Sequence, residues 1–384
     1  MADPPGSPES IKNRRSRLPY VALGLVIVLA VALGYGLSHR ASLSAGASGG
    51  APIADFSGVQ LNGSGAAAPD FQGISDWENS PPLRLDTLRG KVVLVDFWTY
   101  SCINCQNTFP YLRKWYQAYR DQGLVVVGVH TPEFEFEKSV PNIRQAIKRY
   151  DVTWPVAVDP NHVTWDSYNN QYWPAEYFVD KDGKLRHMHF GEGEYDKTEQ
   201  VIRGLLAEAG HKVRPAGADA GPQPQGPQTA ELYAAAGRGF DIPSEHPGIA
   251  FDYKDPGADS QGHRKNNALF WNGLWNIGLE SAEHTRASQP GQDYAAVDYN
   301  ATTVVMVAAN AAAPVKTYIT MDGTDVPHKE AGADIKYDEA GHSYVLVDRS
   351  DLFTLLKHQS FQEHTVKVSP VGPGFRLFTF DFKG

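Results

Sequence analysis

The stretch VDFWTYSCINC, residues 95–105, decides the fold of the first half of the chain. Its first three residues are the end of a Val-rich run, KVVLVDF at 91–97. This composition is typical of a strand buried on both faces of a sheet. From Cys102 onward, apolar and aromatic residues recur at helical spacing. The sequence therefore predicts a buried strand that leads directly into a helix opening at Cys102, with Pro110 expected to kink that helix.

The spacing of Cys102 and Cys105 suits dithiol–disulfide exchange. The dipole and free N–H groups of a helix N-terminus stabilise a thiolate and lower its pKa, so Cys102 is the expected attacker. Cys105 follows one helical turn later, close enough to resolve a mixed disulfide. An inert structural disulfide is one alternative, although so short a loop constrains the unfolded chain little. A metal half-site is another, for which only His187 and His189 on a predicted strand offer a second half.

The same alternation of strand and helix signals continues over residues 70–210. Strands are expected at 124–130, 155–159, 175–180 and 185–190, and helices at 140–150, 162–169 and 197–208. Asp182-Gly183 between the last two strands is a hairpin signal. This order predicts an α/β domain, a mixed sheet with helices on both faces.

Residues 230–384 have a different character. Apolar and aromatic runs alternate with Gly, Pro, Asp and Asn, a pattern typical of an all-β sandwich or jelly roll. The runs are 268–277, 302–308, 314–321, 344–348, 365–369 and 375–380. Ser350–His358 gives the best helix signal, about two turns long. Residues 211–229, rich in Pro, Gly, Gln and Ala, are expected to form an inter-domain linker.

The N-terminal region predicts a membrane anchor. No residue from Leu18 to Leu37 is charged, and a helix of this length spans roughly 30 Å, one bilayer core. The basic residues of segment 1–17 place the N-terminus in the cytoplasm, so residues after about 37 are expected outside it, in a bacterial periplasm or cell envelope. Residues 38–69 would then be a flexible tether. A cleaved signal peptide is the alternative, because residues 44–47 (SAGA) offer a cleavage-like pattern.

Charge and cysteine content exclude other classes. The formal net charge is −9, which argues against a nucleic-acid partner because phosphate binding needs the opposite sign. The chain has 2 cysteines, which excludes a disulfide scaffold and a four-cysteine metal site. No metal or other cofactor is expected.

Several motifs carry a resemblance to a known family. Val-Asp-Phe-Trp leading to Cys-x-x-Cys, with Asp96 six residues before Cys102 and Pro110 eight after it, resembles thioredoxin. APDF at 68–71, LRGKVVL at 88–94 and an insert at about 138–170 look like the extracytoplasmic TlpA-type branch. WTYSCINC at 98–105, VHTPE at 129–133, YWPAEY at 172–177 and FGEG at 190–193 look like the periplasmic part of DipZ proteins. That resemblance also implies a second domain similar to carbohydrate-binding modules, in the place of residues 230–384.

The resemblance implies roles for several residues near the cysteines. Asp96 takes the place of thioredoxin's buried carboxylate, which handles the proton of the resolving thiol. Pro174 takes the place of a cis-proline whose neighbouring backbone pairs with the substrate, and Trp173 would contact substrates. Trp98 and Tyr100 would belong to the substrate-binding rim, although aromatic residues here pack in the core by default. By resemblance, Glu133 and Glu176 lie near the site, unless they are solvated charges.

The expected function is that of a membrane-anchored thiol–disulfide oxidoreductase acting on disulfide-bearing envelope proteins. Reduction is slightly favoured, because most TlpA-type proteins serve reductive tasks. Asn104 replaces the proline of thioredoxin before the second cysteine, so the potential does not carry over. The multi-helix electron-importing module of DipZ has no counterpart in a single predicted span. A reductant would therefore need a separate CcdA-type membrane electron donor.

Two other functions stay open. A thiol peroxidase is suggested by Thr99-x-x-Cys102, although the peroxiredoxin pattern also needs a proline where this chain has Val95. A binding protein with a structural thioredoxin fold is the second, with envelope polysaccharide as the partner of residues 230–384. Five aromatic residues there either stack on sugar rings or pack in the core: Trp271, Trp275, Tyr294, Tyr299 and Tyr318.

Overall fold

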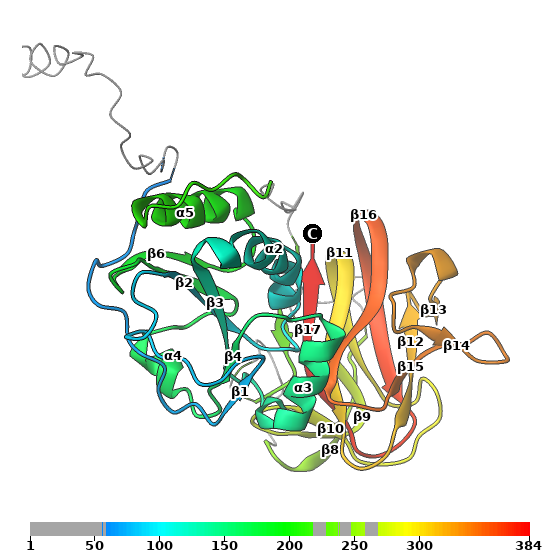
Figure 1. The fold of residues 1–384 in the computed structure, drawn as a ribbon. Coiled ribbons are helices and arrows are strands. Elements are labelled where there is room, and N and C mark those ends of the chain that lie inside the picture. The colour runs from blue at the N-terminus through cyan, green and yellow to red at the C-terminus, as the bar shows by residue number, and fades with distance from the viewer. Residues whose placement is uncertain (1–55, 57–58, 218–227, 237, 239–246, 258–267) are drawn as a thin grey trace, which may run out of the picture. The chain divides into compact units, whose positions relative to one another are not determined.

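Figure 1 shows a computed structural model of the chain, which describes residues 56, 59–217, 228–236, 238, 247–257 and 268–384. Residues 51–384 belong to one compact unit. Within these described ranges, no helix is both long and apolar enough to cross a bilayer. The predicted span Leu18–Leu37 lies outside the described residues.

The first half of the chain forms a mixed sheet of six strands, ordered β1-β4-β3-β2-β5-β6. Strands β2, β3 and β4 are parallel, whereas β1, β5 and β6 pair antiparallel with their neighbours. All seven residues of β2 are buried, as expected for a central strand. The strands are β1 (Asp76–Glu78), β2 (Val92–Trp98), β3 (Leu124–His130), β4 (Val156–Val158), β5 (Ala175–Val179) and β6 (Leu185–Phe190).

Helices cover both faces of this sheet, as predicted. Leu94 and Trp98 of β2 share a core with α2, α3 and α5, while Val95 and Phe97 point to the opposite core with α4. In Figure 1, α2 and α5 lie along one side of the sheet and α4 along the other. The helices are α2 (Ile103–Tyr119), α3 (Val140–Arg149), α4 (Val163–Ser167) and α5 (Tyr195–Glu208), with short 3-10 turns η1 (Arg120–Gln122) and η2 (Glu135–Lys138).

The second half, which we call the β domain, is an antiparallel sheet of 11 strands. Strand β11 pairs with β9 near its start and with β17 over its second half, so the sheet folds back on itself. The strands are β7 (Leu232–Tyr233), β8 (Ala250–Tyr253), β9 (Phe270–Ile277), β10 (Ala282–His284), β11 (Tyr294–Asn310), β12 (Val315–Met321), β13 (Thr324–Asp325), β14 (Lys336–Tyr337), β15 (Ser343–Val347), β16 (Asp351–Pro370) and β17 (Phe375–Lys383), with a 3-10 turn η3 (His328–Glu330).

The predicted helix Ser350–His358 is wrong, because strand β16 begins at Asp351 and includes the rest of this segment. Phe353 and Leu355 point into the core of the β domain, while Leu352 on the other face packs in a second cluster with Phe134 of the first half. Burial on both faces of a strand removes the alternation of polar and apolar residues and leaves a pattern that imitates a helix.

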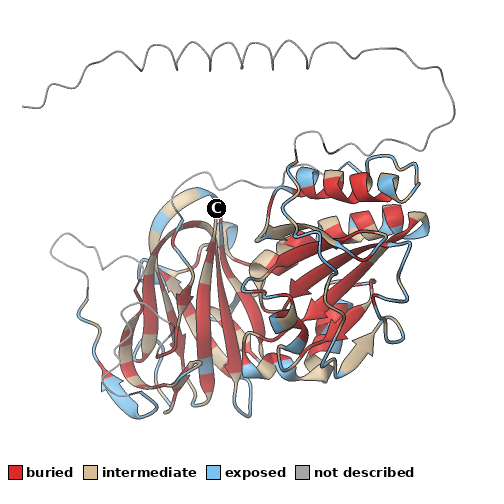
Figure 2. Cartoon of the chain, turned by 90° about the vertical axis from the view of Figure 1, so that its left-hand side faces the viewer, coloured by how far each residue is buried: buried red, intermediate tan, exposed pale blue. Residues whose placement is uncertain are grey.

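Buried residues run through the strands of both sheets, coloured red in Figure 2. A separate apolar cluster joins the two sheets. It combines Phe134, from the segment after β3, with five residues of the β domain: Val305, Val307, Ala309, Leu352 and Phe378. The β domain thus packs directly against the segment that follows β3.

Candidate redox site

The N-terminus of α2 positions the two cysteines. Cys102 is the N-cap residue, and its Sγ accepts a hydrogen bond from the backbone N–H of Cys105 at 3.3 Å. Cys105 is fully buried and Cys102 is partly exposed, and both are free thiols. The prediction of a helix that opens at the first cysteine is confirmed. Of the two cysteines, Cys102 is therefore the one nearer the surface.

The pKa of Cys102 differs from the expectation. Burial raises it above its usual value, and Glu133 and Glu231 raise it further, which outweighs the hydrogen bond from Cys105. Burial likewise raises the pKa of Cys105 well above its usual value, with added contributions from Cys102 and Asp96. Both thiols are therefore held protonated near neutral pH in this arrangement.

Two carboxyl groups lie beneath the cysteines. Asp96 of β2 and Glu176 of β5 are register partners on neighbouring strands, so their side chains share one face of the sheet, and both are buried. Burial raises the pKa of Asp96 to about 8. Burial and the nearby Asp96 raise the pKa of Glu176 well above its usual value. The alternative that Glu176 is a solvated charge is wrong, because its side chain is buried on β5, which lies between β2 and β6.

A third buried acid, Glu137, was missed by the sequence analysis. It accepts hydrogen bonds from the Ser101 hydroxyl and from the backbone N–H groups of Glu133 and Phe134. Burial raises its pKa to about 7. Glu137 therefore ties the segment after β3 to the residue before Cys102. Its only sequence signal is an acidic residue within a short apolar turn, which does not distinguish it from a surface charge.

Cys102 lines a cleft of about 260 Å³. Trp173 lines this cleft, packs at a tilt against Trp165 with a centroid distance of 4.1 Å, and donates from Nε1 to the Thr131 carbonyl at 3.0 Å. The Trp173–Pro174 peptide bond is cis, as the resemblance implied. Trp173 is thus held at the cleft by two contacts.

Trp98 and Tyr100 do not form the rim that the resemblance implied. Trp98 is fully buried, with its ring against Phe109 and His130. Tyr100 is 2% exposed and stacks on His130. Trp98 ends the central strand β2 and Tyr100 lies in the loop that follows it, and both rings pack in the core beside the loop that leads to the cysteines.

The β domain supplies the opposite side of the cleft. Glu231 and Tyr233 at β7, and Thr379 and Asp381 on β17, line it together with Arg238. These residues could not be placed near the cysteines from sequence, because they lie more than a hundred positions away and belong to another sheet.

Other predicted features lie elsewhere or find no support. Among the described residues, no group of three or more His, Cys, Asp or Glu could hold a metal ion. In the β domain, three aromatic rings proposed for sugar stacking are buried in the core: Trp271, Trp275 and Tyr299. Tyr294 and Tyr318 are partly exposed, with Lys367 and Lys316 over their rings at 4.3 and 4.7 Å.

Comparisons with known proteins agree with this site. The AhpC/TSA family model matches residues 64–188, and the model of a thioredoxin-like C-terminal domain matches residues 231–382. Protein DipZ of Mycobacterium tuberculosis (strain CDC 1551 / Oshkosh) is 35% identical over 332 residues, which are 84% of this chain and 44% of DipZ. The chain therefore spans less than half the length of this relative.

Two shorter proteins match the first half. The thiol-disulfide oxidoreductase YkuV of Bacillus subtilis is 34% identical over 140 residues, 36% of this chain and 94% of YkuV. The crystal structure of a thiol-disulfide isomerase from Corynebacterium glutamicum has 25% identity and a TM-score of 0.34, and covers 36% of this chain and 96% of that one. The chain belongs to the thioredoxin-like thiol-disulfide oxidoreductases and is a homologue of DipZ.

Proposed function

We propose that the chain is a membrane-anchored, extracytoplasmic oxidoreductase that exchanges disulfides with envelope proteins, with Cys102 as nucleophile and Cys105 as the resolving thiol. One observation carries this assignment. Cys102 is the N-cap of α2 and lines the cleft beside Trp173, and its sulfur lies 3.3 Å from the Cys105 backbone nitrogen. A partly exposed cysteine beside a buried one is the arrangement that sequential attack and release require.

In the reductive direction, the Cys102 thiolate attacks one sulfur of a client disulfide. A bond forms between these two sulfurs, and the other client sulfur leaves as a thiolate and takes up a proton. Cys105 then loses its proton and attacks the Cys102 sulfur, which releases the second client thiol and leaves a Cys102–Cys105 disulfide. Two electrons and two protons pass to the client. The reverse sequence oxidises a dithiol client.

In this proposal the ionised form of Asp96, a minority form near neutral pH because its pKa is about 8, takes the proton of Cys105. Its charge is close enough to raise the pKa of Cys105, and its own pKa of about 8 suits proton exchange near neutral pH. Neither Asp96 carboxyl oxygen has a hydrogen-bond partner among the described side chains and backbone groups. A thiol proton therefore meets no competing donor at this acid.

Trp173 and Pro174 are the substrate-binding residues of the proposal. Trp173 lines the cleft, and Pro174, which is buried directly behind it and precedes strand β5, would act through the backbone next to it. Trp98 and Tyr100 act only by holding the preceding loop in place, since both are buried.

The proposal also covers the direction of electron transfer, the cellular location and the role of the β domain. We favour reduction, in which case the electrons come from a separate CcdA-type membrane donor. The segment Leu18–Leu37 would be the anchor, with the following residues in a periplasm or cell envelope. The β domain would be a jelly-roll module similar to carbohydrate-binding modules that localises the enzyme on envelope polysaccharide. Three of its aromatic candidates are buried, so binding would use other residues.

The reduction potential of the Cys102–Cys105 pair in the full chain tests this function. The protein is equilibrated in glutathione buffers and read by alkylation mass shift, with Cys102→Ser as control. A value near −270 mV, about that of thioredoxin, supports a reductant, and one near about −120 mV supports an oxidant. A pair that cannot be reduced without unfolding would overturn the proposal. Rapid consumption of peroxide would instead support the thiol peroxidase.

A further inference from the structure

The cleft that holds Cys102 has walls from both halves of the chain. The first half contributes Ser101–Asn104 and Trp173, and the β domain faces them with Val307 of β11 and with residues of β7 and β17. An enzyme of this fold could expose its sulfur on an open surface. Here a client must instead enter between the α2 N-terminus and the β domain.

Specific contacts hold the β-domain wall in place. The ring of Phe378 packs edge-on against Phe134 and Phe136 at centroid distances of 5.0 and 4.8 Å. At the rim of the cleft, the Tyr233 hydroxyl donates to the Glu133 carboxylate at 2.8 Å. Aromatic packing and a hydrogen bond at the same junction thus fix the β-domain side of the cleft against the segment after β3.

Carboxyl groups outnumber cations in the lining of the cleft. Its lining holds three carboxyl groups, Glu133, Glu231 and Asp381, against one guanidinium, Arg238. Arg238 already pairs with Glu133 at 2.6 Å. Lys383, the other nearby cation, lies 3.1 Å from Glu192 and 3.9 Å from Asp381.

Among the described residues that line the cleft, Glu231 is a carboxyl group that forms no ion pair. It accepts a hydrogen bond from the Thr379 hydroxyl at 3.1 Å, and its other carboxyl oxygen lies 3.2 Å from the Tyr233 hydroxyl, whose proton goes to Glu133. No Lys, Arg or His among the described residues lies within ion-pair distance of it. Burial together with Glu133 and Asp381 raises its pKa to about 8. An incoming cation would stabilise its ionised form.

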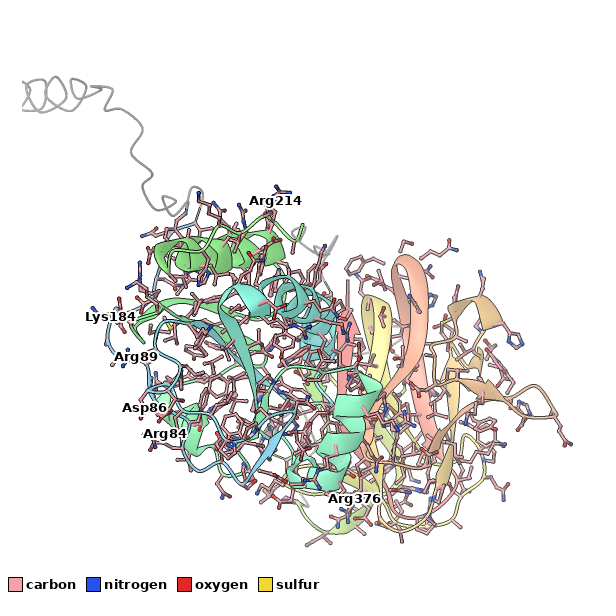
Figure 3. The ribbon with its side chains drawn as sticks, viewed as in Figure 1. Arg84, Asp86, Arg89, Lys184, Arg214 and Arg376 are labelled. Carbon is pink, nitrogen blue, oxygen red and sulfur yellow. The ribbon has the colours of Figure 1, made fainter. Side chains whose placement is uncertain are left out.

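Three exposed basic residues of the first half, Arg84, Arg89 and Lys184, do not supply that cation. They lie on the side of the first sheet away from the β domain, where Arg84 pairs with Asp86 at 2.9 Å (Figure 3). The cations nearest the cleft, Arg238 and Lys383, already pair with other carboxylates, Arg238 with Glu133 and Lys383 with Glu192 and Asp381, so a further positive charge beside Glu231 would have to come with the client.

A client cation would also help the chemistry. Glu133 and Glu231 raise the pKa of Cys102, so a positive charge between them and the sulfur would oppose this effect and favour the thiolate. The size of the cleft limits the form of the client. At about 260 Å³ it is smaller than most small-molecule pockets and admits an extended segment, not a folded surface.

Resting on the proposed function, we propose that Glu231 and Asp381 make the β domain a specificity wall, which selects disulfides whose reactive cysteine lies in an extended segment flanked by Lys or Arg. The β domain then acts at the redox site itself, in addition to any role in localisation.

Single-turnover kinetics of the fully reduced full chain test this inference. Three short peptides carry one cysteine as a mixed disulfide with a chromogenic aryl thiol, and differ only in flanking residues: Lys-Cys-Lys, Ser-Cys-Ser and Glu-Cys-Glu. Release of the aryl thiol gives the second-order rate constant. For the wild type we expect the Lys peptide to react about tenfold faster than the Glu peptide, the rate effect of roughly 1.4 kcal/mol.

The variant Glu231→Gln/Asp381→Asn should reduce this ratio to about twofold or less. The matched control Glu339→Gln/Glu363→Gln removes two exposed carboxylates of the same domain and should keep the wild-type ratio. Because the first variant could unfold, the wild-type ratio is also measured from low to high salt, where screening should shrink it. Equal rates for all three peptides at low salt, or an unchanged ratio in the folded cleft variant, would overturn the specificity wall. No reaction with any peptide would overturn the proposed function instead.

Discussion

Replacing Asp96 with asparagine should stabilise the protein, and increasingly so as the pH rises. The Asp96 side chain is 1% exposed, and burial raises its pKa from 3.8 to about 8. Below about pH 4 the carboxyl is protonated in the folded and the unfolded chain, so its ionisation contributes no difference. Between about pH 4 and 8 it ionises only in the unfolded chain, which favours unfolding.

The magnitude follows from the size of the shift. Each pH unit in this window lowers the free energy of unfolding by about 1.4 kcal/mol, so the wild type loses about 4 kcal/mol by pH 7. Above about pH 8 the effect is constant. An asparagine side chain has nearly the same shape as the aspartate and cannot ionise, so the variant lacks this loss. Any cost of burying its amide group is independent of pH and does not alter the slope.

Guanidinium unfolding between about pH 4 and 9, followed by tryptophan fluorescence and by circular dichroism, measures the difference. The difference in unfolding free energy between Asp96→Asn and wild type should rise by more than about 1 kcal/mol per pH unit from about pH 5 to 7 and level off above about pH 8. Asp121→Asn, whose side chain is 89% exposed, serves as the control and should give no comparable slope. A flat difference for Asp96→Asn across this range would refute the reasoning.

Three further variants test other parts of the structure. Cys105→Ser should accumulate a mixed disulfide between Cys102 and a client, because release is blocked, and the adduct should be visible on non-reducing gels; its absence there would count against the assigned order of attack. Phe378→Ala removes a ring that is 3% exposed at the junction of the two sheets and should lower the free energy of unfolding by about 3 kcal/mol; a loss below about 1 kcal/mol would show that the junction contributes little. Gly273→Ala places a Cβ 2.2 Å from the Asp293 Cγ at a φ of +93° and should lower the melting temperature of the β domain; an unchanged melting temperature would contradict the close approach.

Local sequence was sufficient to predict most strands and helices of the first half. The VDFW run and the periodicity after Cys102 predict β2 and α2 to within a residue, because a buried strand and an amphipathic helix leave distinct patterns. The helix predicted at 350–358 failed because β16 is buried on both faces. The sequence could not predict which residues of the β domain lie next to the cysteines. Nothing near Glu231 in the sequence indicates that it faces Cys102, since that contact depends on how two sheets pack.

The sequence analysis expected a lowered pKa for Cys102, and this failed because residues distant in the sequence also affect that pKa. A helix N-terminus favours a thiolate, and the hydrogen bond from the Cys105 N–H is present. That local effect is opposed by burial and by Glu133 and Glu231, which come from a distant loop and from the other sheet. Cys102, Cys105 and Asp96 therefore all favour their protonated forms in the free protein, for one shared reason, removal from water. A client that brings positive charge into the cleft changes this balance at Cys102 first, since Cys102 lines the cleft and Cys105 does not, and the attack on the client must then precede the loss of the Cys105 proton.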